Sequence, residues 1–229
     1  RGVGRADVDV TDRAALRAFL DAAAFDVLVN GTSYHKTDEV EGNAGLAMEV
    51  NAHAPAIMAE ACAAKGARFL HVSTDYVFGG DAGRATPLTE ADPPAPVNVY
   101  GLSKLFGETL AGLSGGDVTV FRVASLFGVR GASGKGGNFV ETMIRFGREK
   151  GALKVVGDQV MSPTSTATIA RAILAFLEQG GAPGVYHCVN TGAVSWHGFA
   201  EAIVDMAGVK AEVASCTTAE WPTTARRPA

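Results

Sequence analysis

Several features that mark particular classes of protein are missing from this 229-residue sequence. No apolar run approaches the roughly 18–20 residues of a membrane span. The net charge of −4 comes without a basic cluster that would mark a nucleic-acid surface. The three cysteines lie far apart, which disfavours a zinc site or a disulfide framework and fits a reducing compartment. We therefore expect no membrane, nucleic-acid or metal partner, and a cytoplasmic location.

The Gly-rich turn that opens a dinucleotide-binding fold is also missing. Gly2 and Gly4 begin such a pattern, but Asp7 takes the place of its third glycine. We expect that roughly the first 30–40 residues of a usual βαβ start are absent from this chain, and favour this over a protein that lacks them naturally. Residues 131–137 are Gly-rich without a following Gly-Lys-Ser/Thr, which excludes a Walker A loop and leaves a candidate lid.

What the sequence does contain is an alternation of strand-like and helical patterns. Short apolar runs predict buried strands, and periodic apolar positions predict amphipathic helices. The strands are expected over 25–30, 67–78, 118–123, 153–156 and 184–190, and the helices over 13–24, 38–65, from about 97, 138–150, 165–177 and from 195. This alternation predicts an α/β fold, a doubly wound parallel sheet with a small discontinuous α/β lobe.

Two stretches in the middle of the chain carry the chemistry. The strand Phe69–Phe78 includes Ser73 and Thr74, and the following helix places Tyr100 and Lys104 about one turn apart. An ammonium beside a phenol favours the phenolate, so Lys104 is expected to lower the pKa of Tyr100 and prepare it for proton transfer. A lone Tyr-x-x-x-Lys pair is often only a surface feature, and the strand ending in hydroxyl groups is what favours a catalytic role.

These two stretches together resemble the extended short-chain dehydrogenase/reductase superfamily, and within it the dTDP-4-dehydrorhamnose reductase family. The similar segments are Ser73–Phe78, Tyr100–Lys104, Asp9–Asp12, Phe25–Asn30, Val50–Ala52, Gly137–Val140, Ser162–Thr164 and Ala225–Pro228. The resemblance covers nearly the whole chain in order. It implies a Rossmann-like fold, and a C-terminus that ends before the family pattern does.

The resemblance also implies roles for individual residues. Thr74, Tyr100 and Lys104 would be catalytic, with Thr74 holding the substrate oxygen and Lys104 also holding the nicotinamide ribose. The cofactor, NADPH or NADH, would be bound by Asp9, Val10, Asn30, Gly31, Thr32, Asn51, Ser73, Tyr100, Lys104 and Val123. Asn51, in the middle of a predicted helix, has a structural or functional role on this view, and a simple surface position is the alternative.

The sugar nucleotide would contact a second group of residues. The resemblance places His35, Asp75, Tyr76, Ser125, Asn138, Phe139, Ser162, Thr164 and Arg226 there. An exposed loop position is the alternative for His35, and a basic tail is the alternative for Arg226. Ser125 stands where the family carries a tryptophan at the sugar, which leaves the identity of the sugar open.

The domain organisation implied by the resemblance is discontinuous. Residues 1–128 and 158–190 would form the nucleotide-binding domain without its first βα unit, and residues 129–157 and 191–229 the substrate-binding lobe. The expected activity is NAD(P)H-dependent reduction of the 4-keto group of a dTDP-linked deoxysugar. The alternatives are an epimerase or dehydratase of the same superfamily, or a non-catalytic regulatory subunit that binds the cofactor. A homodimer is left open.

Overall fold

The computed structural model describes residues 1–81, 84, 86–131 and 136–228. The chain forms two compact units. Unit 1 comprises residues 1–122, 182–187 and 224–228, and unit 2 comprises 123–181 and 188–223. The functional domain limits given above remain a prediction. No helix among the described residues has both the length and the apolar character needed to cross a membrane.

Unit 1 is built on a sheet with the strand order β1–β2–β3–β8 among its described residues. These strands are β1 (Val27–Asn30), β2 (Arg68–Thr74), β3 (Asp117–Val123) and β8 (Gly184–His187). The pairs β1–β2 and β3–β8 are parallel. Because β1 and β2 run in the same direction, their carboxyl ends meet at one edge, which is where ligands bind in folds of this type. The predicted α/β fold with a parallel sheet is confirmed.

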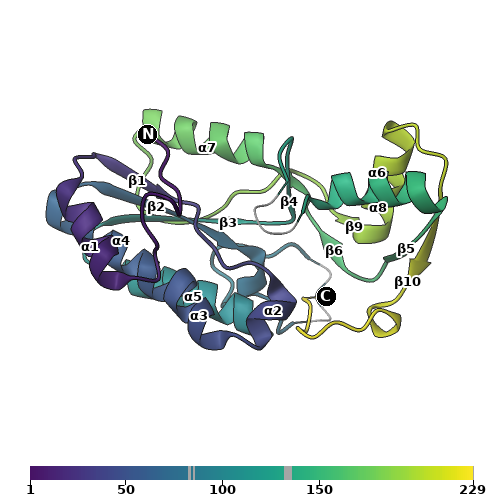
Figure 1. Cartoon of the computed structure of the whole chain (residues 1–229), viewed down its shortest axis with the longest axis horizontal. Coiled ribbons are helices and arrows are strands. Elements are labelled where there is room, and N and C mark those ends of the chain that lie inside the picture. Colours follow the sequence, from purple (N-terminus) through teal and green to yellow (C-terminus); the bar gives the residue numbers. More distant parts are fainter. Residues whose placement is uncertain (82–83, 85, 132–135, 229) are drawn as a thin grey trace. The chain divides into compact units, whose positions relative to one another are not determined.

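Helices pack on this sheet around an apolar core. Figure 1 shows α1 (Arg13–Ala22), α4 (Ala54–Lys65) and α5 (Val99–Gly112) lying together along one side of β1 and β2. The buried cluster that joins them consists of Leu16, Leu20, Ala54, Ile57, Met58, Ala59, Cys62, Ala67, Phe69 and Ala111. Asp12 caps α1 by accepting hydrogen bonds from the backbone N–H groups of Ala14 and Ala15, as its sequence position predicts.

The segment 38–65 is mostly helical, as predicted, but it divides into four parts. These are α2 (Thr37–Glu41), α3 (Ala44–Met48), the π-helical turn η1 (Glu49–His53) and α4. Gly42 ends α2 and Asn43 precedes α3, so two poor helix formers mark the break. Pro55 lies in the first turn of α4, where its missing N–H costs little. The π-helical turn carries Asn51, and such turns are frequent at functional sites.

Helix α5 lies unusually close to η1. A Cβ atom built on Gly107 would come 2.1 Å from the carbonyl oxygen of Asn51, whereas one built on Gly112 would meet no atom within 4 Å. Both glycines lie in α5, so only the first is required by packing. A methyl group at position 107 would fit against the backbone of Asn51 only if α5 moved away from η1.

We therefore expect Gly107→Ala to destabilise the protein by about 1–3 kcal/mol. The matched control Gly112→Ala should be neutral or stabilise by up to about 1 kcal/mol, because alanine favours helix over glycine. Chemical denaturation followed by circular dichroism measures both free energies of unfolding. Equal effects of the two substitutions would contradict the close packing of α5 on η1.

Unit 2 has its own core between helices and a parallel strand pair. Helices α6 (Phe139–Lys150) and α8 (Trp196–Met206) pack on β5 (Ala152–Val156) and β10 (Glu212–Cys216). The buried residues there are Met143, Leu153, Val155, Ala200, Ile203, Val204 and Val209. Asn138 caps α6 and Ser195 caps α8, at the positions where these helices were predicted to begin.

The remaining described elements of unit 2 are α7 (Thr166–Glu178), the 3-10 turn η3 (Thr218–Glu220) and two pairs of two-residue strands. Ser165 caps α7. The pair β4 (Leu126–Phe127) and β7 (Thr164–Ser165) is parallel, and the pair β6 (Val160–Met161) and β9 (Val194–Ser195) is antiparallel. Strands of two residues have no readable periodicity, so the sequence did not predict them.

Candidate active site

The carboxyl end of β2 supplies the first part of the candidate site. The strand ends at Thr74, and the chain turns directly into the 3-10 turn η2 (Asp75–Val77). The predicted strand to Phe78 is therefore too long. Thr74 caps the turn by accepting a hydrogen bond from the backbone N–H of Tyr76 at 3.2 Å, and its hydroxyl donates to the Asp75 carboxylate at 3.1 Å. The hydroxyl of Thr74 is thereby held in one place at the strand end.

The first turn of α5 brings Tyr100 to the same place. Asn98 caps this helix through the backbone N–H of Gly101, at 2.8 Å. A Cβ atom on Gly101 would lie 2.0 Å from the carbonyl oxygen of Tyr76, so the missing side chain lets α5 approach η2. As a result the rings of Tyr76 and Tyr100 meet edge to face at 5.5 Å, and the Thr74 side chain lies close enough to the Tyr100 hydroxyl to lower its pKa.

The pKa of Tyr100 differs from the sequence-based expectation. Burial raises the pKa of the Tyr100 phenol above its ordinary value, hydrogen bonding to Thr74 acts in the opposite direction, and Lys104 is not among the causes. The predicted lowering of this pKa by Lys104 is therefore wrong for the protein without ligands. Desolvation disfavours the phenolate, so Tyr100 carries its proton at neutral pH, in the form that can act as a general acid.

Lys104 lies one turn further along α5 and is directed at strand β2. Its side chain is only 1% exposed. The side-chain nitrogen Nζ donates to the carbonyl oxygen of Val72 at 2.8 Å and lies 3.2 Å from Nε2 of His71. Burial lowers the pKa of Lys104 to about 7, and the negative charge of Glu108 acts against this. Lys104 can therefore change its charge near neutral pH.

Asn51 links the loop after β1 to helix α5. Its Oδ1 accepts from the backbone N–H of Tyr34 at 2.8 Å, and its Nδ2 donates to the Tyr34 carbonyl at 3.0 Å and to Ser103 Oγ at 2.9 Å. Ser103 in turn donates to the Tyr100 carbonyl oxygen at 2.8 Å. Asn51 is 0% exposed, which rules out the surface alternative and supports a positioning role. Direct contact with a cofactor remains a prediction.

A buried ion pair supports the other side of α5. Glu108 and Arg122 are 7% and 6% exposed, and the guanidinium contacts the carboxylate through Nε–Oε1 at 3.1 Å and Nη2–Oε2 at 2.7 Å. Ser73 also donates its hydroxyl to Glu108. The Ser73 hydroxyl therefore belongs to this network, and its predicted contact with the cofactor remains a prediction. Sequence reasoning missed Glu108 and Arg122, although a charged residue inside each apolar segment is a signal that could have found them.

Tyr76 and Asp75 complete the edge of the site. Burial raises the pKa of Asp75 to about 6 and that of Tyr76 to about 12. Arg227 opposes the shift of Tyr76 through its charge and a hydrogen bond, and its guanidinium forms an ion pair with Asp38 at 2.6 Å. The sequence-based set contained Arg226, which is exposed, with its carbonyl accepting from Asn98. Arg227 is the arginine that reaches Tyr76, and it was missing from that set.

The predicted cofactor residues at the start of the chain have local contacts. Asp9 accepts from the backbone N–H and hydroxyl of Thr11 at 3.0 and 2.8 Å, and these hydrogen bonds lower its pKa. Val10 packs against the core of unit 1. After β1, Asn30 Oδ1 accepts from the backbone N–H of Thr32 at 2.9 Å. Gly31 is exposed. His35 Nδ1 lies 3.2 Å from the Ser33 carbonyl oxygen.

The remaining predicted residues lie in unit 2, where hydrogen bonds join three of them. The backbone N–H of Thr164 donates to the carbonyl oxygen of Ser125 at 3.3 Å, and the Thr164 hydroxyl donates to the Ser162 carbonyl at 2.9 Å. Ser125 has a φ of +43°, a backbone conformation that non-glycine residues rarely adopt outside functional or strained sites. Val123 is buried at the end of β3.

Asn138 and Phe139 have contacts at the start of α6. Asn138 accepts from the backbone N–H of Glu141 and donates to the Gly128 carbonyl at 2.7 Å. Phe139 packs against Trp196 and Phe199, with ring centroids 4.7 and 5.7 Å apart. Both side chains therefore have structural partners, and their contact with a substrate stays a prediction.

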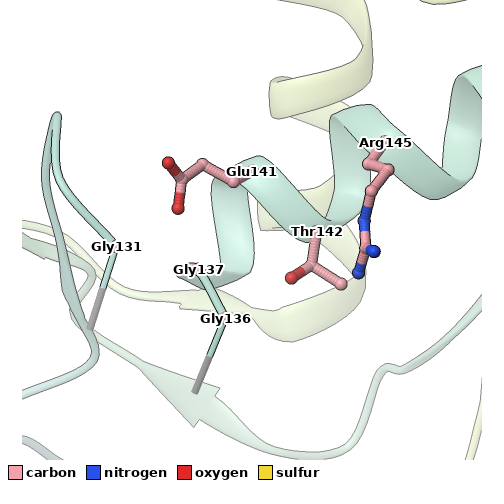
Figure 2. Close-up of a pocket in the computed structure, with 6 residues that line it drawn as sticks. All are labelled: Gly131, Gly136, Gly137, Glu141, Thr142 and Arg145. Atoms are coloured by element: carbon pink, nitrogen blue, oxygen red, sulfur yellow. The ribbon is translucent and has the colours of Figure 1, made fainter. Parts of the chain in front are cut away.

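A pocket of about 340 Å³ lies at the same end of α6. Figure 2 shows Glu141, Thr142 and Arg145 extending from the helix, with Gly131, Gly136 and Gly137 beside them. It contains none of the predicted catalytic residues. The centre of the candidate lid, residues 132–135, lies outside the described residues. In the part of the chain that the structure describes, no group of three or more His, Cys, Asp or Glu side chains could hold a metal ion.

The fold and this arrangement define a class of protein. A parallel sheet whose second strand ends in a threonine, next to a helix that presents Tyr-x-x-x-Lys, is the arrangement of a short-chain dehydrogenase/reductase. All residues from 1 to 229 match the family described as RmlD substrate binding domain, and the chain belongs to that family.

Similar proteins agree with this assignment. The chain is 36% identical to the dTDP-4-dehydrorhamnose reductase of Burkholderia thailandensis, over 99% of this chain and 79% of the relative. It matches the structure of dTDP-4-dehydrorhamnose reductase from Bacillus anthracis in complex with NADP with a TM-score of 0.91 and 32% identity, over 99% of this chain and 78% of that chain. For the Clostridium acetobutylicum reductase the TM-score is 0.89 at 36% identity, with 97% and 76% covered.

Proposed function

We propose that this protein is an oxidoreductase that reduces the 4-keto group of a dTDP-linked deoxysugar with a nicotinamide cofactor, NADPH or NADH. The observation that carries the proposal is the placement of Tyr100. Its phenol keeps its proton and lies beside the Thr74 side chain at the carboxyl end of β2. The relatives named dTDP-4-dehydrorhamnose reductase support the substrate class, and the relative solved with NADP supports the cofactor.

The groups at the ends of β1 and β2 suit a nicotinamide nucleoside. Hydroxyl groups of Thr32 and Thr74 and the amine of Lys104 stand at or near this edge. They can donate and accept hydrogen bonds with ribose hydroxyls without bringing a carboxylate cluster against the phosphates. Asp9 and Val10 would contact the adenine end of the cofactor, and the turn Asn30–Thr32 would contact its middle part. Asn51 would hold that turn in place.

The chemistry that the bound cofactor supplies is hydride transfer to the carbonyl carbon. The chain must then supply a proton to the carbonyl oxygen. Tyr100 donates that proton, and Thr74 holds the same oxygen through its hydroxyl. This division requires a protonated phenol before the reaction, which the raised pKa of Tyr100 provides. Lys104, one turn away, would bind the ribose and supply a positive charge as the phenolate forms.

Substrate contacts are proposed for both units. Asp75, Tyr76, His35 and the exposed guanidinium of Arg226 would serve in unit 1, the last as a partner for the diphosphate. Ser125, Asn138, Phe139, Ser162 and Thr164 would serve in unit 2. A cytoplasmic enzyme, with a homodimer as an open possibility, agrees with this proposal. The functional domain limits 1–128 with 158–190, and 129–157 with 191–229, belong to it as well.

The direct test is an assay of cofactor consumption with dTDP-4-keto-6-deoxy-L-mannose. We expect NADPH or NADH absorbance to fall only when the keto sugar nucleotide is present, and the ratio of the two rates gives the cofactor preference. Product formation without net cofactor consumption would replace the reductase by an epimerase or dehydratase. Cofactor binding without turnover of this or related keto sugars would favour a regulatory subunit instead.

A further inference from the structure

A chain of buried polar groups behind the site connects β1, β2 and α5. Asn30 and His71 are paired across β1 and β2 in the parallel register, and Asn30 Nδ2 lies 3.1 Å from His71 Nδ1. The other ring nitrogen, Nε2, lies 3.2 Å from Lys104 Nζ. Asn30, His71 and Lys104 are 2%, 0% and 1% exposed. These groups are shielded from bulk water, so their donors and acceptors need partners inside the protein.

One end of this series of buried polar groups fixes the direction of the hydrogen bonds within it. The backbone N–H of Thr32 can only donate, and it lies 2.9 Å from Asn30 Oδ1. Turning the amide of Asn30 around would place two donors against each other, so Nδ2 is the group that faces His71. An amide nitrogen donates and does not accept. Nδ1 of His71 must therefore accept, and the single proton of a neutral ring is on Nε2.

The other end of the series is compatible with this direction. Lys104 Nζ lies 2.8 Å from the carbonyl oxygen of Val72, which can only accept. The Nε2–H of His71 points at the same nitrogen, and an ammonium has no lone pair to receive it. An amine does, and it keeps two N–H groups, one of which serves Val72. We propose that Asn30 and His71 hold Lys104 as a neutral amine in the protein without ligands, with His71 donating from Nε2.

The electrostatics of the site are consistent with this state. Burial lowers the pKa of Lys104 to about 7 and that of His71 far below its ordinary value, so a doubly protonated ring is disfavoured. The negative charge of Glu108, on the same helix as Lys104, acts in the opposite direction and raises the pKa of Lys104. The carboxylate of Glu108 is already neutralised by Arg122 of β3. His71 is thus a positioning residue, which acts on the reaction through Lys104.

This arrangement has a consequence for turnover, and this step rests on the proposed function. A negatively charged cofactor favours the ammonium form of Lys104. Lys104 would then take up a proton as the cofactor binds, and the Nε2–H of His71 would have to yield its position. The positive charge beside Tyr100 would in that case appear only in the complex, where the phenolate develops.

The test is nitrogen NMR on the labelled protein without ligands. In two-bond correlation spectra the shift of a protonated ring nitrogen differs clearly from that of a nitrogen with a lone pair. We expect His71 to carry its proton on Nε2 at pH 8, and the carbon next to Lys104 Nζ to show the shift of a neutral amine. A proton on Nδ1 of His71, or an ammonium at pH 8, would overturn the proposal whatever the catalytic assay shows.

One substitution is expected to reverse the direction of these hydrogen bonds. In Asn30→Asp a carboxylate oxygen replaces the donor, so Nδ1 of His71 should take the proton and Nε2 should accept from Lys104. We expect the His71 tautomer to invert and the Lys104 titration to move upward by more than one pH unit. Asn43→Asp, at an exposed helix cap, adds the same charge elsewhere and should change neither signal. An unchanged tautomer in folded Asn30→Asp would contradict the proposal, and the wild-type spectrum decides the matter alone if that variant does not fold.

Discussion

Replacing Tyr100 by phenylalanine is expected to lower kcat by about 10²–10⁴-fold, the usual contribution of general acid catalysis. Only the phenolic hydroxyl is removed, and the ring that meets Tyr76 at 5.5 Å is retained. The Kd for NADPH should therefore change by no more than a few-fold. Steady-state kinetics with the keto sugar nucleotide, together with fluorescence titration of NADPH, separate the two quantities.

A matched control is available in β8. Tyr186 donates its hydroxyl to the carbonyl oxygen of Ala182 at 2.8 Å, and neither residue is among those assigned to the reaction. Tyr186→Phe should leave kcat within about two-fold of wild type, since the loss of an exposed hydrogen bond costs little. Near-normal turnover of Tyr100→Phe would show that the proton comes from another group, and Asp75, with a pKa of about 6, would be the next to test.

The second large effect is expected on stability, from Glu108→Gln. This substitution keeps the shape of the side chain but leaves the buried guanidinium of Arg122 without its counter-charge. Breaking a buried pair in this way costs about 3–5 kcal/mol. The free energy of unfolding from urea denaturation measures the loss, and activity at low temperature shows whether the site survives in the folded fraction.

Two further variants define the cause of this loss. Glu60→Gln removes a carboxylate from the exposed pair with Arg17, whose side chains are 51% and 54% exposed, and should cost less than about 1 kcal/mol. The double variant Glu108→Leu with Arg122→Met removes both buried charges, and should recover much of the stability lost in Glu108→Gln. If Glu108→Gln and Glu60→Gln lower the free energy of unfolding by the same amount, the buried ion pair contributes no more to stability than the exposed one.

The local signals in the sequence were sufficient for most of the fold. Asp12, Asn138, Ser165 and Ser195 mark helix starts, and the structure uses each of them as a cap. Short apolar runs identified the strands of the main sheet. These features depend on residues a few positions apart, which is the range over which capping and periodicity act.

The parts that the sequence did not predict depend on contacts between distant segments. The approach of Gly107 to Asn51 is set by how closely α5 packs on η1, and no local pattern encodes that distance. Lys104 was predicted to act on Tyr100, its neighbour on the helix, whereas its side-chain nitrogen contacts His71 and Val72 of strand β2. A histidine inside an apolar strand was the available signal, but its partner could not be known without the register of β1 and β2.

The path of the chain through the two units has a consequence for how the protein folds during synthesis. The sheet of unit 1 receives its fourth described strand only at residues 184–187, and residues 224–228 join the same unit after the whole of unit 2 has been made. Residues 184–187 and 224–228 must therefore leave the ribosome before unit 1 has all its described segments. Until then the open edge of β3 has no partner strand, and exposed edges of this kind favour association between chains. Thr74, Tyr100 and Lys104 are made before these segments, so the framework around them can close only after residues 224–228 have been synthesised.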